Sequence, residues 1–152
     1  MTCSTQTMKT PYSNSCTVIC PLKLETPRGH VYYLNFNNFH RWGMMERYRV
    51  KNLFNLEVGP QLDKTLRKYI ANKYEIQYVL YVPDRRKRDL ANACCIVGKY
   101  LEDLLQTKGI TKDDSCDYLP KIVYAYGGID TDNPRIEATI IWSNEVNGEI
   151  KC

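Results

Sequence analysis

Runs of apolar residues bounded by Gly, Pro or Asp predict five β-strands along the chain. The runs are rich in β-branched and aromatic side chains, and they cover residues 17–24, 30–36, 75–82, 121–126 and 135–142. Pro21 interrupts the first run, and because proline cannot donate a ladder hydrogen bond, that strand is expected at a sheet edge. The run at 75–82 is expected to be a central strand.

Apolar residues repeated every three or four positions predict three helices. The first covers residues 41–56 and is expected to end before Gly59-Pro60, after which a second helix carries Leu62, Leu66, Tyr69 and Ile70. The third, residues 89–108, has the clearest pattern, because its five apolar positions fall within an arc of about 100°. These positions are Cys94, Val97, Leu101, Leu104 and Leu105, and Gly109 is expected to end the helix.

The order of these elements, β-β-α-α-β-α-β-β, predicts one small α/β domain of mixed α+β type. A mixed sheet is expected to pack against about three helices. The polar segment 1–15, rich in Ser and Thr, is expected to be a flexible leader, which leaves residues 16–152 as the folded domain. A chain of 152 residues is long enough for one domain with one core.

The composition limits the class of protein. Hydrophobic residues make up 43% and charged residues 25%, close to the average of globular proteins. No apolar run approaches the roughly 18 residues of a membrane span, and the amino-terminal segment lacks the apolar core of a secretory signal. The seven cysteines include no C-x-x-C pair, and the two histidines stand at no zinc-finger spacing. Reduced thiols in a cytoplasmic protein without a membrane partner are therefore expected, with Cys94 as a small buried apolar residue.

The formal net charge of +4 hides an uneven distribution. Residues 41–88 hold 12 Lys and Arg against 5 Asp and Glu, a net of +7, whereas residues 89–152 hold 6 against 11, a net of −5. The basic half ends in Arg85, Arg86, Lys87 and Arg88. Such a run is typical of a surface that binds the phosphate backbone of DNA, and it is also typical of a solvated face.

The helix at 89–108 has a polar side opposite its apolar side. This polar side is formed by Asp89, Asn92, Lys99 and Asp103, which fall within another arc of about 80°. One interpretation is a solvated face with a Lys99–Asp103 ion pair at i,i+4 spacing. The other is one side of a functional site.

The loop after this helix carries two adjacent aspartates, Asp113 and Asp114. Aspartates in loops are commonly turn residues. If the loop folds back toward Asp89, however, the converging carboxylates would repel one another and need a cation, and oxygen ligands suit Mg²⁺ or Mn²⁺. Such a metal activates water and stabilises charge on a phosphodiester. Acids for a metal beside basic residues for phosphate indicate a metal-dependent nuclease.

The order of these motifs resembles the RusA family of Holliday-junction resolvases, which are common in phages. A strand that ends at Val82 leads into PDRRKRDLAN, and Lys99, Gly109 and the Asp113-Asp114 pair follow in the family's order. The resemblance covers residues 75 to about 142. More weakly, LNFNNFHRW at residues 34–42 is similar to the amino-terminal, Asn-containing segment of the family.

The resemblance implies a homodimeric endonuclease that binds four-way or branched DNA and cuts it with Mg²⁺ (or Mn²⁺) during recombination and repair. By position, Asp89 and Asp114 would be catalytic, metal-binding acids, Asp113 would support them as a ligand, and Lys99 would contact the scissile phosphate. The implied DNA-binding residues are Arg85, Arg86, Lys87, Arg88 and Asn92. The resemblance also implies a phage protein in the cytoplasm of a bacterial host.

Two positions depart from the family pattern. Many members carry an acid where this chain has Ala91, and a longer phage branch carries an acid directly before the lysine, where this chain has Gly98. A missing carboxylate favours a second hypothesis, a catalytically impaired relative that serves as a DNA-binding module or binds a host protein. Because a glycine inside a helix costs roughly 1 kcal/mol relative to alanine, Gly98 is not expected to serve stability.

A third hypothesis is a globular protein whose basic segment is only a solvated face. The 12 tyrosines are expected mostly as half-buried packing residues. Phe36, Phe39 and Trp42, in the Asn-containing segment, are the aromatic residues expected to stack on DNA bases.

Overall fold

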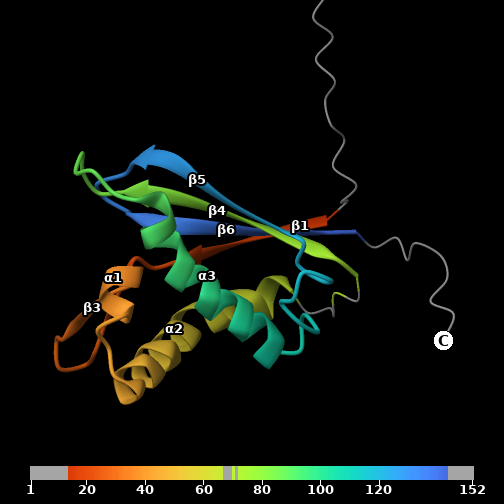
Figure 1. The fold of residues 1–152 in the computed structure, drawn as a ribbon, viewed down its shortest axis with the longest axis horizontal. Coiled ribbons are helices and arrows are strands. Elements are labelled where there is room, and N and C mark those ends of the chain that lie inside the picture. The colour runs from red at the N-terminus through yellow and green to blue at the C-terminus, as the bar shows by residue number, and fades with distance from the viewer. Residues whose placement is uncertain (1–13, 67–69, 71, 144–152) are drawn as a thin grey trace, which may run out of the picture.

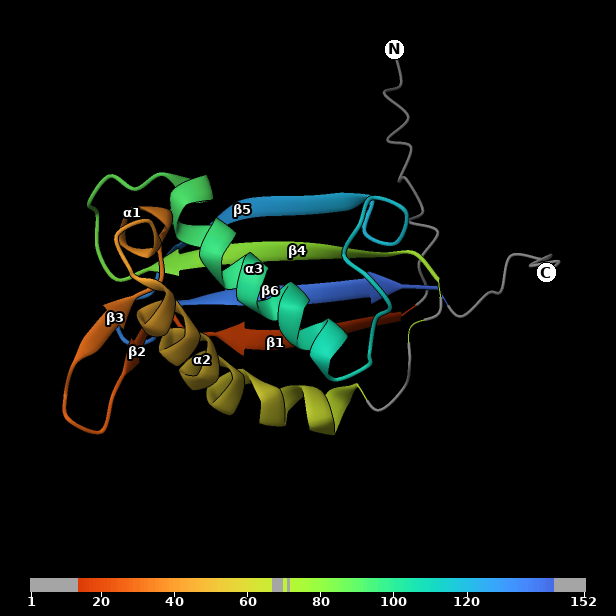
Figure 2. The same cartoon turned by 60° about the horizontal axis from the view of Figure 1, so that its bottom comes forward.

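A four-stranded mixed sheet with helices on one face forms the body of the protein in a computed structural model, which describes residues 14–66, 70 and 72–143 (Figures 1 and 2). This arrangement confirms the predicted small α+β domain. The elements are β1 (Asn14–Cys20), β2 (Lys23–Glu25), β3 (Val31–Tyr33), α1 (Phe36–Phe39), α2 (Met44–Thr65), β4 (Tyr74–Val82), α3 (Leu90–Thr107), β5 (Lys121–Ile129) and β6 (Arg135–Trp142).

The strand order in the sheet is β1-β6-β4-β5. Strand β6 runs antiparallel to both β1 and β4, and β5 runs parallel to β4. The predicted central strand is therefore central, and the predicted edge strand lies at an edge. Pro21 separates β1 from β2, however, so the single strand predicted at 17–24 is in fact two.

The core lies between the sheet and the two long helices, because alternate side chains of the strands point to the helix-covered face. Several of these side chains have no exposed surface, namely Val18, Ile76, Tyr78, Ile136 and Ile140. Cys94 of α3 is also fully buried, as predicted, and burial raises the pKa of its thiol to about 12.

The predicted break at Gly59-Pro60 is wrong, because α2 continues through it. Val50, Phe54, Val58 and Leu62 are fully buried at every fourth position, and this apolar ridge holds the helix against the core. Pro60 removes the hydrogen bond to the carbonyl of Leu56. Leu56 lies on the exposed side of α2, where water can satisfy that carbonyl. The position predicted for Tyr69 lies outside the described residues.

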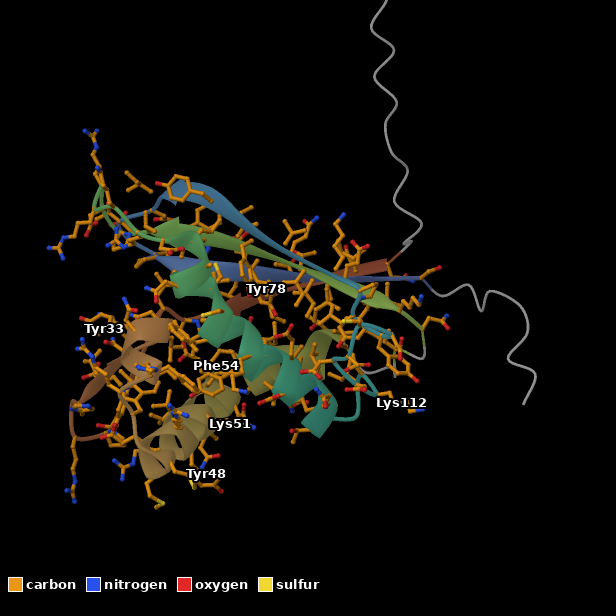
Figure 3. All side chains as sticks on the ribbon, viewed as in Figure 1. Tyr33, Tyr48, Lys51, Phe54, Tyr78 and Lys112 are labelled. Atoms are coloured by element: carbon orange, nitrogen blue, oxygen red, sulfur yellow. The ribbon has the colours of Figure 1, made fainter. Side chains whose placement is uncertain are left out.

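The helix predicted at 89–108 is confirmed as α3, which crosses the sheet beside α2 (Figure 2). The ring of Tyr78 lies between the sheet and this helix (Figure 3), and its hydroxyl is 3.5 Å from the carbonyl oxygen of Gly98. A Cβ atom at position 98 would lie 3.3 Å from that ring, closer than ordinary contact. The absence of a side chain at position 98 therefore allows α3 to lie this close to Tyr78.

A second, smaller sheet lies beside the helices, and the first strand of the main sheet begins near the amino terminus. Strands β2 and β3 form a two-stranded sheet next to α1 and α2 (Figure 2). Strand β1 begins at Asn14, so the last two residues of the segment 1–15 belong to a strand and the others lie outside the described residues. Among the described helices, none combines the length and the apolar character needed to cross a membrane.

Candidate nucleic-acid interface and metal site

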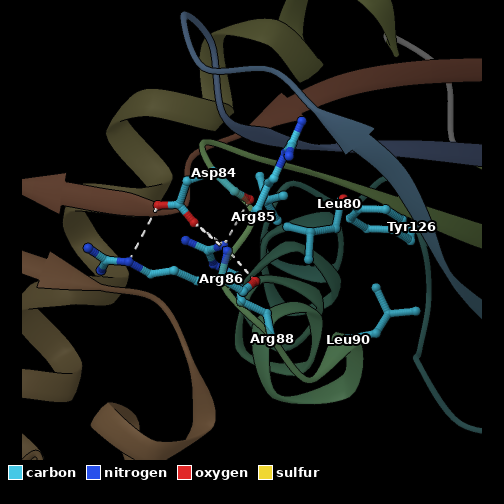
Figure 4. A pocket seen from close by; sticks show the side chains of 8 residues that line it. Leu80, Asp84, Arg85, Arg86, Arg88, Leu90 and Tyr126 are labelled. Carbon is cyan, nitrogen blue, oxygen red and sulfur yellow. Dashed lines mark hydrogen bonds and ion pairs between the residues drawn. The ribbon is translucent and has the colours of Figure 1, made fainter.

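The basic run lies in the loop between β4 and α3, and Asp84 organises this loop (Figure 4). One carboxylate oxygen of Asp84 accepts hydrogen bonds from the Arg86 backbone N–H at 2.9 Å and from the Arg88 guanidinium at 2.7 Å. The hydrogen bond from Arg88 lowers the pKa of Asp84 to about 2, and the Arg86 N–H contributes. Sequence reasoning overlooked this role of Asp84, although Asp directly after Pro is a turn signal.

The four basic side chains of this loop consequently differ in how freely they can bind a phosphate group. Arg88 is paired with Asp84 at 2.7 Å, and Arg86 approaches the same carboxylate at 3.8 Å while staying largely exposed. Arg85 and Lys87 are exposed, and no carboxylate of the described residues pairs with them. Arg85 and Lys87 are therefore the side chains most available to a phosphate.

A small pocket lies between this loop and the sheet (Figure 4). Its charged rim comes from Asp84 and three arginines, and its apolar wall comes from Leu80, Val82, Leu90 and Tyr126. The basic loop is thus fixed against the end of the sheet where β4 and β5 finish.

Asp89 caps the amino terminus of α3. Its Oδ1 accepts hydrogen bonds from the backbone N–H groups of Ala91 at 3.0 Å and Asn92 at 3.4 Å. These bonds satisfy two of the N–H groups that the first turn leaves unpaired. The carboxylate of Asp89 is exposed, as a metal ligand could be, but one of its oxygens already serves the helix.

Asn92 connects α3 to α1, because its Oδ1 accepts a hydrogen bond from the Asn37 backbone N–H at 3.1 Å. This contact places α1 beside the first turn of α3. On α1, the Phe36 ring is 51% exposed and stacks on His40 with 5.9 Å between ring centroids. Phe36 is therefore the most exposed of the three aromatic residues that were expected to stack on DNA bases.

Phe39 and Trp42 are only partly exposed, because they pack into the protein. Their rings lie 6.1 Å apart, and the Arg47 guanidinium lies 4.2 Å from the centre of the Phe39 ring. Trp42 also meets Tyr32 edge-on at 5.5 Å. Their main role in this structure is to pack α1 against its neighbours.

Asp113 and Asp114 lie in the loop that connects α3 to β5. Asp113 Oδ1 accepts hydrogen bonds from the N–H groups of Asp114 at 2.8 Å and Ser115 at 3.3 Å, so Asp113 shapes a turn. Its bond with the Ser115 side chain holds the pKa of Asp113 below its usual value. The Tyr74 hydroxyl donates to the Asp113 carbonyl oxygen at 3.1 Å, which places this loop beside the beginning of β4.

The acids predicted to share a metal are far apart within one chain. Asp89 follows the carboxyl end of β4, whereas the Asp113 loop lies at its amino end. The 18 residues of α3 between them span about 27 Å at 1.5 Å per residue. Across the part of the chain that the structure describes, no three His, Cys, Asp or Glu side chains gather closely enough to hold a metal. The residues of a single chain therefore do not fit the Mg²⁺ site that the family resemblance implies.

Glu102 is the acid that sequence reasoning missed. It is largely buried on α3, and burial raises its pKa to about 7, with Asp114 and Asp103 adding to the rise and Lys99 opposing it. Glu102 therefore responds to the charges of both Lys99 and Asp114. A signal existed in the sequence, because Glu102 falls at the border between the polar and apolar sides of the helix.

Lys99 is exposed on α3, but it does not form the ion pair expected with Asp103. Instead, Asp103 Oδ2 lies 3.2 Å from the Nζ atom of Lys51 on α2. A helix face that looked solvated in isolation is therefore partly covered by the neighbouring helix.

The two positions that lack a family acid have different environments. Ala91 is exposed in the first turn of α3, next to the Asp89 carboxylate. Gly98 is buried and faces Tyr78. An acid at position 91 would extend the exposed carboxylate site, whereas an acid at position 98 would enter the core.

Compared with known proteins, the chain matches no protein-family model and no curated protein sequence. The likeness to the RusA family accordingly rests on the motifs in residues 75–142 and on the weaker segment at 34–42.

Proposed function

We propose that this protein binds branched DNA as a RusA-type junction protein, with the loop between β4 and α3 as the phosphate-binding surface. The observation that carries the proposal is the exposed pair Arg85 and Lys87 on a loop that Asp84 holds in place. A fixed loop loses little conformational entropy when it binds, so its two cations can act together on one backbone.

The aromatic pair on α1 adds to this surface. Phe36 and His40 stack on each other at the end of α3 where the basic loop lies, and Asn92 fixes α1 there. An exposed ring beside a phosphate-binding loop suits a DNA branch point, where bases lose a stacking neighbour and can stack on protein rings instead.

Mg²⁺-dependent cutting of the junction is part of the proposal as the family resemblance implies it. Because Asp89 and Asp114 lie at opposite ends of α3, cutting requires a second copy of the chain to complete the acid site. The alternative is a catalytically impaired relative that binds DNA or a host protein without cutting. The absence of an acid at Ala91 and the buried position of Gly98 favour that alternative.

The test is binding of a labelled four-way junction and of a duplex of the same length, followed by nicking assays with Mg²⁺ and with Mn²⁺. Junction binding without nicking would select the impaired module. Absence of binding to either DNA at low salt would contradict the proposal and point to a protein partner.

A pair of charge-matched variants sharpens the binding test. R85A/K87A should weaken binding to any DNA sequence and lower the slope of log affinity against log salt by about 2, since each phosphate contact contributes about 0.9. The control R49A/K64A removes the same charge from exposed positions on α2, and it should leave that slope unchanged. Equal effects of the two variants would exclude the loop as the specific contact surface.

A further inference from the structure

The pocket beside the basic loop lies where open α/β sheets commonly bind ligands. Strands β4 and β5 are parallel and connected by α3, and the pocket lies at their carboxyl ends, next to Leu90 in the first turn of that helix. Its floor is formed by Leu80 and Val82, which are buried. The cavity measures about 250 Å³, somewhat less than the roughly 300–1,000 Å³ of pockets for drug-sized ligands, so it suits a single flat ring system.

Tyr126 gives this pocket an aromatic wall that is open to solvent. In the parallel register Tyr126 is the partner of Leu80, so both side chains lie on the helix-covered face of the sheet. Because β5 is the last strand of the sheet, Tyr126 stays 61% exposed, whereas Tyr78 on the inner strand β4 has no exposed surface. An exposed tyrosine ring beside an apolar floor is a surface on which another ring can stack.

The other side of the pocket is positively charged (Figure 4). Three arginines and one aspartate line it, which gives a net charge of +2. Arg88 pairs with Asp84 at 2.7 Å and neutralises that carboxylate, and Arg86 stays largely exposed at 3.8 Å from it. Arg85 has no carboxylate partner among the described residues. Arg85 and Arg86 can therefore bind an anion at the mouth of the pocket.

The apolar and the charged sides together identify the occupant. A nucleotide joins a flat ring, whose faces are largely apolar, to a phosphate, and the pocket offers an aromatic wall beside two arginines. An apolar protein side chain would fill the same space but leave the arginines without an anion. At a DNA branch point, bases have lost a stacking neighbour, so they leave the helix at a lower cost than paired bases within an arm.

We propose that one base at the branch point leaves the DNA stack and enters this pocket, where it stacks on Tyr126 while its phosphate binds Arg85 and Arg86. The proposal rests on the proposed function, because it requires that the basic loop binds branched DNA. It adds a subsite for an unpaired nucleotide, and it explains a preference for branches, since a base within an arm would first have to break its pair. Leu90 directly follows Asp89, so the extruded nucleotide brings its strand toward that candidate metal ligand.

The first test locates the extruded base by photo-crosslinking. A set of four-way junctions carries 5-iodouracil at each branch-point position in turn, and a control junction carries it inside a paired arm. In one member of the set, irradiation should join the branch-point base to the peptide that contains Tyr126, as identified by mass spectrometry. The paired base should give no such product. Y126F should keep this crosslink and Y126A should lose it. Branch-point crosslinks that reach only Phe36 or His40 would overturn the pocket.

The second test asks whether the pocket contributes to the preference for a branch. Y126A should weaken junction binding about tenfold or more, because it removes a stacking partner of one base, and it should change duplex binding by less than about twofold. Y126F should bind both DNAs as the wild type does. L90F, which fills part of the pocket and leaves the arginines in place, should also weaken binding to the junction alone.

A matched control and the contrary results complete the binding test. Y48A removes a tyrosine of similar exposure, 65%, from α2 and should change neither affinity. Equal weakening of junction and duplex binding by Y126A would overturn the proposal, as would unchanged junction binding by L90F.

The outcomes separate the pocket from the function on which it depends. If the wild type binds the junction, Y126A binds it equally well and no crosslink reaches Tyr126, the pocket is rejected and the proposed function stands. If the wild type binds neither the junction nor the duplex, both are rejected.

Discussion

The two ends of α3 carry opposite chemistry. At the amino end, Asp89 is an exposed carboxylate that caps the helix, and the basic loop precedes it. In the second half, Glu102 is a largely buried carboxyl group with a pKa raised to about 7, and Asp114 lies near it. Acids that follow one another closely in a sequence motif can therefore lie far apart in the structure, because a helix between them holds them at its two ends.

The largest effect should come from moving an acid between the two environments. G98D should lower the free energy of unfolding by about 3 kcal/mol or more, because the new carboxylate would be buried against Tyr78. A91D should change it by only about 0.5 kcal/mol, because position 91 is exposed and near the positive end of the helix dipole. Urea denaturation of both variants measures the difference. Similar losses in the two would mean that Gly98 is not packed as described.

A91D also tests the amino end as a metal site. A second exposed carboxylate beside Asp89 should strengthen Mn²⁺ binding, which titration calorimetry measures. G98D should show no such gain, even at a temperature where it stays folded. Stronger Mn²⁺ binding by G98D, with no change in A91D, would mean that position 98 and not position 91 lies at the metal site.

An effect of intermediate size should come from Glu102, because its raised pKa makes the stability of the protein depend on pH. Its pKa in the folded protein, about 7, is above the usual value of 4.5, so the folded state favours the protonated form. The stability that this group contributes is therefore complete below pH 4.5 and is lost as the pH rises through 7. E102Q keeps a neutral side chain at every pH, and above pH 7 it should be more stable than the wild type by at most about 3 kcal/mol.

The measurement for Glu102 is the melting temperature of wild type and E102Q between pH 4 and pH 8. The two curves should meet at low pH and separate as the pH rises. D103N is a control on the same helix, since Asp103 is paired with Lys51 in a half-exposed ion pair. Parallel curves for E102Q and the wild type would contradict a raised pKa at Glu102.

The smallest effect should come from the helix cap. D89A should cost about 1 kcal/mol, because it removes the acceptor for the N–H groups of Ala91 and Asn92. D89N keeps an acceptor oxygen and should cost much less, while it removes the negative charge proposed to bind the metal. Chemical denaturation distinguishes the two variants, and an equal cost would mean that charge, not capping, is the stabilising property of Asp89.

Most elements of the fold were predictable because the sequence patterns are local. The strands at 75–82 and 135–142 and the helix at 89–108 were found within one residue of their observed ends. The break at Gly59-Pro60 was predicted wrongly, because a proline signal is local whereas the buried ridge of α2 is a tertiary feature. The close approach of Tyr78 to Gly98 is also a tertiary feature, since the two residues are 20 positions apart in the sequence.

The candidate site was predictable in part. The basic run and the exposed Asp89 cap follow from residue type and position along the chain. The sequence did not indicate that Asp84 pairs with Arg88. It also did not indicate that Asp103 pairs with Lys51 and not with Lys99. It also did not indicate that Glu102 is buried, because burial depends on what packs over a helix face.

The sequence by itself determined most of the helices and strands, the mixed fold class and the concentration of positive charge before Asp89, because these depend on side-chain periodicity and composition. Only the tertiary structure decided which charged groups lie together. The parallel crossover from β4 through α3 to β5 sends Asp114 to the opposite end of the sheet from Asp89. The physical reason is the rise of 1.5 Å per residue along a helix. The 18 residues of α3 hold Asp89 and Asp114 at a distance that no side chain can bridge.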